Sequence, residues 1–219
     1  MFDPLIATVA PFECLICNKE GDIICRQCQP KAISRKASTC FMCNKLTKDF
    51  RACATCKRKT KASGVVVASH YKGAIKELVQ SFKYHRAMAG CRVAAQLIAP
   101  ALNNLDINLI TAMPTATHRF RQRGYNQSVL IAKHLAIILN VPFTATLSRH
   151  GQNRQVGTNR AKRISQLQGA MYCINRNLAG KKILVVDDVL TTGASMNEAA
   201  AVLKSKGAKS VWGAVLAKH

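Results

Sequence analysis

One short segment constrains the fold of this chain more than any other. An apolar run at residues 183–186 leads into the adjacent acids Asp187 and Asp188, then into a loop rich in hydroxyl groups, and then into a helical pattern at residues 195–205. This order of strand, loop and helix is typical of a parallel α/β sheet, in which ligands bind at the carboxyl ends of the strands. Gly193 allows the loop to turn its N–H groups inward, and the helix adds the positive end of its dipole, so the loop can hold a phosphate.

The side chains around this loop fit a sugar phosphate. Thr191, Thr192 and Ser195 offer hydroxyl groups, and Ser195 and Glu198 have the spacing of a capping box. Two adjacent carboxylates are costly to bury without partners, and ribose hydroxyls can donate to both. The alternative, an acidic pair that merely begins a turn, is disfavoured by the complete order of motifs. The candidate catalytic groups are Asp187 and Asp188. The candidate ligand-binding residues are Asp187, Asp188, Leu190, Thr191, Thr192, Gly193, Ala194 and Ser195.

The chain before this motif alternates between strand and helix patterns. Strands are predicted at residues 65–71, 107–112, 143–147 and 211–216, and helices at residues 74–84, 92–102 and 127–139. Residues 149–168 are polar and basic and predict a long loop. We therefore predict an α/β domain over residues 63–219, a parallel sheet flanked by helices, preceded by a small cysteine-rich domain over residues 1–62.

Eight of the ten cysteines form four CxxC pairs. Each pair can bend into a knuckle that presents two thiolates, and two pairs complete the tetrahedral four-sulfur site that zinc prefers. Two structural zinc ions are expected, and both sequential and interleaved pairing of the knuckles satisfy the spacing. The predicted ligands are Cys14, Cys17, Cys25, Cys28, Cys40, Cys43, Cys53 and Cys56.

Other uses of these cysteines fit less well. Four disulfides need an oxidising compartment, whereas residues 1–13 lack the basic and apolar regions of a signal peptide, and no apolar run is long enough to span a membrane. Redox CxxC motifs usually occur once, and iron–sulfur proteins use other spacings. We expect a cytoplasmic protein without membrane insertion, in which Cys91 and Cys173 are ordinary buried thiols.

The charge is strongly basic. The chain carries 33 Lys and Arg against 10 Asp and Glu, a net charge of +23. Between Ile107 and Val186 there is no acidic residue, but there are 12 basic ones. A surface kept only for solubility usually mixes both signs, so this imbalance favours a polyanionic partner.

The segment at residues 183–195 resembles the signature of type I phosphoribosyltransferases. The resemblance implies that residues 190–195 hold the 5′-phosphate of phosphoribosyl diphosphate and that Asp187 and Asp188 hold its ribose. In that family a second loop binds the diphosphate with Mg²⁺. Its counterpart here is expected at residues 113–115.

Further motifs make the chain similar to the ComF family of competence proteins over essentially its whole length. They are residues 82–84, residues 119–123, the Arg-Gly-Tyr-Asn-Gln motif at residues 123–127, and the CxxC segment; Gln155 and Arg163 match more loosely. The resemblance implies a role in natural transformation, with single-stranded DNA handled after import. Competence helicases and recombination mediators are the implied protein partners.

The residues also point to nucleic acid by their own chemistry. Three arginines interleaved with Phe120 and followed by Tyr125, on an expected loop, combine phosphate contacts with stacking faces. Core packing of both aromatic rings, and arginines that serve only the diphosphate, are the alternatives. The candidate nucleic-acid residues are Arg119, Arg121, Arg123, Tyr125, Asn126, Gln127, Gln155 and Arg163.

Three functions fit these patterns. The first is a competence protein that handles single-stranded DNA and keeps a phosphoribosyl-diphosphate site. The second is a phosphoribosyltransferase acting on an amine or base, and the third is a sensor that binds phosphoribosyl diphosphate without turnover. The absence of acids between Ile107 and Val186 disfavours the enzyme, which would have to use Asp187, Asp188 or His118 as its base.

Overall fold

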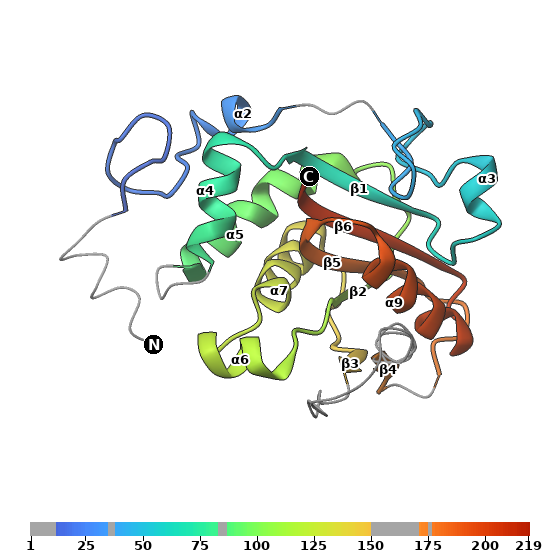
Figure 1. Cartoon of the computed structure of the whole chain (residues 1–219). Helices are drawn as coiled ribbons and strands as arrows, with labels where there is room; N and C mark the ends of the chain where they lie inside the picture. Colours follow the sequence, from blue (N-terminus) through green and yellow to red (C-terminus); the bar gives the residue numbers. More distant parts are fainter. Residues whose placement is uncertain (1–11, 35–37, 83–86, 150–170, 175–176) are drawn as a thin grey trace, which may run out of the picture.

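A parallel four-stranded sheet forms the centre of the computed structural model, which describes residues 12–34, 38–82, 87–149, 171–174 and 177–219 (Figure 1). Its order is β1-β6-β5-β2. These strands are β1 (Gly64–His70), β2 (Leu109–Ala112), β5 (Lys182–Leu190) and β6 (Ser210–Lys218). A separate antiparallel pair joins β3 (Leu147–Arg149) to β4 (Met171–Cys173). The predicted parallel α/β sheet is confirmed.

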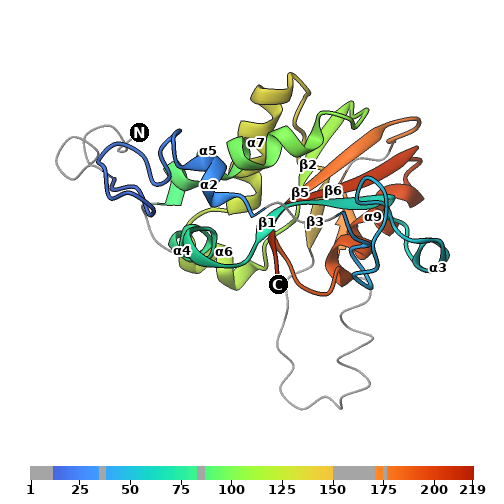
Figure 2. The same cartoon turned by 90° about the horizontal axis from the view of Figure 1, so that it is seen from above.

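Helices cover both faces of the sheet, because side chains along each buried strand alternate between two cores. The first core joins Val66 and Ala68 of β1 to α4 (Gly73–Ser81), α5 (Ala87–Ile98) and α7 (Gln127–Leu139), with the short helix η1 (Ala99–Leu102) after α5. The second core joins Val65 and Val67 to α9 (Ala194–Ser205). Figure 2 shows the two layers from above.

The two cysteine segments pack against different cores. The first, which includes α2 (Gln29–Ala32), buries Ile23 and Ile24 in the first core. The second, which includes α3 (Ala54–Lys57), buries Phe41 in the second core. Figures 1 and 2 show the two segments at separate ends of the molecule. The boundary expected between residues 62 and 63 stays a prediction.

The sequence interpretation missed one helix. Residues expected to form a basic loop form α6 (Thr117–Arg123), which ends at Gly124 in the left-handed conformation, φ 78°. Around the predicted strand at 143–147, Phe143 makes an isolated bridge to Ile110, and Leu147 begins β3. Most of the predicted loop at 149–168 lies outside the described residues. Among the helices that are described, none combines the length and the apolar character needed to cross a membrane.

Candidate functional site

The acidic pair, Asp187 and Asp188, lies in the last part of β5 and contacts the first turn of α7. Ser128 Oγ donates to Asp187 Oδ1 at 2.8 Å, and Gln127 Nε2 donates to Asp188 Oδ2 at 2.9 Å. Asn126 caps the helix, since its side-chain oxygen accepts from the Ser128 N–H at 2.9 Å. The positive end of the α7 dipole therefore faces the two carboxylates.

Gln127 belongs to this cluster, although the sequence placed it among the nucleic-acid residues. Its side chain is 7% exposed, and its Oε1 is buried with no hydrogen-bond partner among the described residues. A buried acceptor without a partner is rare in proteins, and this one belongs to a side chain whose amide nitrogen binds Asp188. Ser128 was missed, because its contact with Asp187 joins residues 59 positions apart.

The phosphate loop, residues 190–195, leads from the end of β5 into the start of α9. Thr191, Thr192 and Ser195 are exposed, and Gly193 is buried in the left-handed conformation, φ 79°, directly before α9. The first N–H groups of an α-helix have no carbonyl partner within the helix and can bind an anion. The loop thus presents hydroxyl and amide donors at the same edge of the sheet as the acidic pair.

The predicted capping box at Ser195 and Glu198 is wrong. The helix begins earlier than expected, with Gly193 as its N-cap and no side-chain hydrogen bond at that cap. Ser195 consequently lies inside the first turn. Glu198 turns instead towards β4, where its Oε1 accepts from the Met171 N–H at 3.1 Å. This leaves the Ser195 hydroxyl exposed at the mouth of the phosphate loop.

The two adjacent carboxylates of the acidic pair disfavour each other's ionised form. Burial and the nearby charge of Asp188 raise the pKa of Asp187 to about 8, and the hydrogen bond from Ser128 only partly offsets them. An unfolded Asp has a pKa of about 3.9, so the folded state binds the additional proton. Stability contributed by protonated Asp187 is therefore complete below about pH 4 and is lost as the pH rises towards about 8.

Asp187→Asn is expected to stabilise the free protein at alkaline pH. The amide oxygen can still accept from Ser128, while the cost of ionising a buried group disappears. We expect a gain of roughly 1–3 kcal/mol at pH 8.5 that shrinks at pH 5. Denaturant unfolding of both proteins at the two pH values measures it. A variant that is less stable than the natural protein at pH 8.5 would contradict the raised pKa.

The eight cysteines of the CxxC pairs form two groups, as sequential pairing predicts. The first cysteine group is Cys14, Cys17, Cys25 and Cys28, and the second is Cys40, Cys43, Cys53 and Cys56; within each, the sulfur atoms lie within 4.8 Å of one another. Cys17 Sγ and Cys25 Sγ are 3.8 Å apart, and Cys43 Sγ and Cys53 Sγ are 3.7 Å apart. A tetrahedron with Zn–S bonds of ~2.3 Å has S···S edges of ~3.8 Å, whereas a disulfide measures ~2.05 Å. Both groups therefore fit a tetrahedral metal ion.

Within each group the pKa values of the thiols are split. Although burial raises them, backbone hydrogen bonds lower the pKa of Cys14 and of Cys40 to about 6. Hydrogen bonds with Cys43 and Cys53, together with burial, raise the pKa of Cys56 to about 12. In the first group, burial and contacts with Cys25 and the other thiols raise the pKa of Cys28 to about 12. Four thiolates this close repel one another, so full ionisation of either group requires a bound cation.

The two remaining cysteines lie outside both groups, as predicted. Cys91 is fully buried, and burial followed by the charge of Asp188 raises its pKa to about 12. Cys173 is half-buried. A neutral, buried thiol is a poor nucleophile and a poor metal ligand, so Cys91 serves as packing behind the acidic pair.

The predicted basic surface lies partly on α6, next to the site. Arg121 and Phe120 are exposed, the ring at 50%, while Arg123 is half-buried. Tyr125 is also half-buried, and its hydroxyl donates to the Phe82 carbonyl. Core packing is thus excluded for the Phe120 ring and applies in part to Tyr125.

Several predicted residues have no described side chain or fall outside the described ranges. These are His118, Arg119, Gln155 and Arg163. The turn expected to hold the diphosphate starts beside the acidic pair, because the Met113 N–H donates to the Val186 carbonyl at 2.9 Å. Asn126 Nδ2 fixes the same turn through the Met113 carbonyl at 3.0 Å.

A separate basic cavity lies at the opposite, amino edge of the sheet, between α3 and α9. Its volume is about 610 Å³. Its lining has three lysines and no acid: Lys57, Thr60, Lys61, Ala62, Ser63, Ala201, Lys204 and Ser205. Because β1 begins beside this cavity and the acidic pair lies near the end of β5, the cavity is separate from the phosphate loop.

Comparison with known proteins agrees with this geometry. Residues 126–219 match the model of the phosphoribosyl transferase domain. The chain is 26% identical to competence protein F of Haemophilus influenzae, over 86% of this chain and 95% of that protein. It is 24% identical to competence protein ComFC of Streptococcus pneumoniae, over 93% and 92%, and 26% identical to the DNA utilization protein YhgH of Salmonella typhimurium, over 86% and 87%.

Proposed function

We propose that this chain, a homologue of competence protein F and ComFC with a phosphoribosyl transferase domain, binds a phosphoribosyl-diphosphate-type sugar phosphate and handles single-stranded DNA in natural transformation. One observation carries the first part. The acidic pair, held by the first turn of α7, and the exposed donors of the phosphate loop lie at the same carboxyl edge of the sheet.

The chemistry of that edge matches the parts of such a ligand. The loop donors and the N-terminus of α9 suit the 5′-phosphate, and the two carboxylates suit ribose hydroxyls. The turn that begins at Met113 would face the diphosphate, with Mg²⁺ as its counterion. Mg²⁺ would there offset the charge of the diphosphate, and the residues of this chain would orient the sugar.

The second part, DNA binding, is supported by charge and by α6. This helix begins shortly after β2 and precedes α7, and it presents Arg121 and the half-exposed ring of Phe120. A guanidinium group and an open aromatic face are the pair of groups that bind single strands without reading their sequence. The net charge of +23 adds long-range attraction for a polyanion.

Single-stranded DNA binding is expected to weaken steeply with salt and to depend on α6. Phe120→Ala should cost ~1–3 kcal/mol of binding free energy through lost stacking. Arg121→Ala should lower the slope of log affinity against log salt by about 1. Fluorescence anisotropy with a labelled oligonucleotide at several salt concentrations measures both effects.

Lys31→Ala is the matched control, since this exposed lysine of α2 lies across the molecule from α6 (Figure 1). It should leave the salt slope nearly unchanged. A salt-independent affinity, or equal losses in Arg121→Ala and Lys31→Ala, would rule out α6 as a specific binding surface.

A further inference from the structure

The second knuckle, residues 40–45, packs directly against the phosphate loop. A Cβ atom added to Gly193 would lie 2.8 Å from Phe41 Cδ2, 3.2 Å from Phe41 Cε2 and 3.3 Å from Met42 Sδ. Phe41 is 2% exposed. It shares the second core with Leu190, the first residue of the loop, and with Met196, which directly follows the loop. Phe41 and Met42, which lie between Cys40 and Cys43, thus pack directly beneath Gly193.

A buried lysine fastens this knuckle to the sheet. Lys218, which is 3% exposed, donates from Nζ to the Phe41 carbonyl at 3.1 Å and to Asn44 Oδ1. It is the last residue of β6 and pairs in register with Leu190, where the phosphate loop begins. Removing a hydrogen-bonded partner from a buried charge is costly, so the knuckle and the end of the sheet are held in one arrangement.

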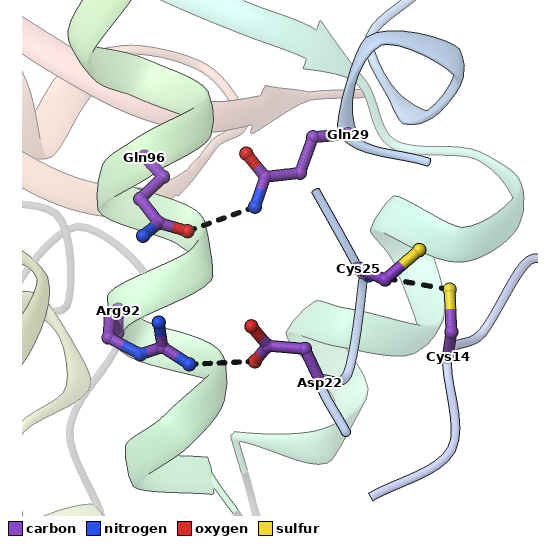
Figure 3. A network of polar contacts seen from close by, with 6 residues as sticks. All are labelled: Cys14, Asp22, Cys25, Gln29, Arg92 and Gln96. Atoms are coloured by element: carbon purple, nitrogen blue, oxygen red, sulfur yellow. Dashed lines mark hydrogen bonds and ion pairs between the residues drawn. The ribbon is translucent and has the colours of Figure 1, made fainter. Parts of the chain in front are cut away.

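The first knuckle, residues 14–19, has the same Cys-x-x-Cys-Asn-Lys pattern and makes different contacts. Its segment is joined to α5 by an ion pair of 2.8 Å from Arg92 to Asp22, and by a hydrogen bond of 2.9 Å from Gln29 to Gln96 (Figure 3). Leu15 stands where the second knuckle has Phe41, and it packs against the first core. The three atoms nearest to a Cβ placed on Gly193 all belong to the second knuckle.

We propose that the second metal site is linked to the sugar-phosphate site, and that Phe41 is the positioning residue that joins them. Metal bound by the second cysteine group holds the knuckle closed, which keeps Phe41 and Met42 beneath Gly193 and keeps the loop in its left-handed turn. The first metal site is outside this linkage. The inference rests on the proposed function, because it concerns how that site is supported.

Linkage acts in both directions. Loss of the second metal, or of the Phe41 ring, lowers the affinity for the sugar phosphate. Bound sugar phosphate in turn retains the second metal and protects its thiolates from reaction, because the liganded loop holds the knuckle in place. A ring that only filled space in a stable fold would produce no ligand-dependent protection of cysteines.

The first test compares two matched variants of the zinc-loaded full chain, Phe41→Ala and Leu15→Ala, by calorimetric titration with phosphoribosyl diphosphate and Mg²⁺. We expect affinity to fall ~10-fold in Phe41→Ala and to stay within ~2-fold of the natural protein in Leu15→Ala. Zinc is measured in each sample. Equal affinities in the natural protein and in zinc-retaining Phe41→Ala would overturn the linkage.

The second test needs no variant, so it decides the question even where Phe41→Ala loses metal or fails to fold. The natural protein is treated with a chelator that binds zinc but not Mg²⁺ and with an alkylating reagent, with and without phosphoribosyl diphosphate and Mg²⁺, and each cysteine is followed by peptide mass spectrometry. We expect ligand to slow alkylation of the second cysteine group at least ~5-fold and leave the first unchanged.

Each result has a distinct meaning. Equal protection of both groups, or of neither, by a ligand that binds the natural protein would refute the linkage and leave the proposed function standing. No binding of phosphoribosyl diphosphate to the natural zinc-loaded protein would refute the proposed function itself, and the linkage with it.

Discussion

Asp188→Asn is expected to remove half or more of the thermal stabilisation that phosphoribosyl diphosphate with Mg²⁺ gives to the natural protein. A hydrogen bond to a charged acceptor contributes about 1.5–3 kcal/mol, so the loss of the carboxylate should weaken binding about 10–150-fold. Ligand at 100 times its Kd stabilises the folded state by about 2.7 kcal/mol, and at the same ligand concentration the variant would keep only about 0.3–1.4 kcal/mol of that stabilisation.

The variant should still fold, because its neighbours can adapt. The remaining side-chain oxygen can accept from the Val189 N–H, which now donates to Asp188 Oδ1 at 2.7 Å. The new amide would face Gln127 Nε2, but Gln127 has a buried Oε1 without a described partner and can rotate its amide to accept. The fold therefore keeps its hydrogen bonds while the site loses a charge.

The measurement is a thermal unfolding curve at fixed ligand and Mg²⁺ concentrations. Asp106→Asn serves as the matched control, since it makes the same change at an exposed acid just before β2, at the amino edge of the sheet. The control should retain the full ligand-induced shift. An undiminished shift in Asp188→Asn would show that the ligand is held elsewhere.

Removal of metal should have the largest effect on stability. Structural zinc sites in small domains contribute on the order of ~10 kcal/mol each, and chelators unfold such domains. The cysteine segments bury few large side chains of their own, chiefly Ile23, Ile24 and Phe41, so little else holds them. Chelation at pH 7 should release two zinc ions per chain and lower the unfolding midpoint sharply.

Two cysteine variants test whether the zinc ions bind at the two cysteine groups. Cys40→Ser should lose one of the two zinc ions, because Cys40 is a buried member of the second group. Cys173→Ser should keep both, because Cys173 lies outside the two groups. Zinc content follows from metal analysis of the purified variants. An unchanged midpoint after chelation, or two zinc ions in Cys40→Ser, would contradict the account of the metal sites.

The features that the sequence predicted well are local ones. The strand, acidic pair, loop and helix at residues 183–205 are contiguous, and hydrophobic spacing reveals strand and helix there. The CxxC pairs follow from short spacings in the same way, although the spacing left sequential and interleaved grouping open and the structure shows the sequential one. Patterns of this kind depend only on neighbouring residues, so a single sequence is enough to detect them.

The features that the sequence did not reveal depend on contacts between distant residues or on weak local patterns. Helix α6 contains one large apolar residue, Phe120, so it has no hydrophobic period to detect, and Gly124 stops it. The contact of Gln127 with Asp188 joins residues 61 positions apart, and Phe41 and Gly193 are separated by most of the chain. Only the folded structure shows that the acidic pair is hydrogen-bonded to α7 and that the second knuckle packs against the phosphate loop.

The structure of the zinc-loaded protein crystallised with phosphoribosyl diphosphate and Mg²⁺ tests the central claim most directly. The account predicts the 5′-phosphate on the backbone amides and hydroxyls of residues 191–195, with ribose hydroxyls within hydrogen-bonding distance of Asp187 and Asp188. A ligand bound in the basic cavity beside Lys57 and Lys204, with the phosphate loop empty, would contradict it.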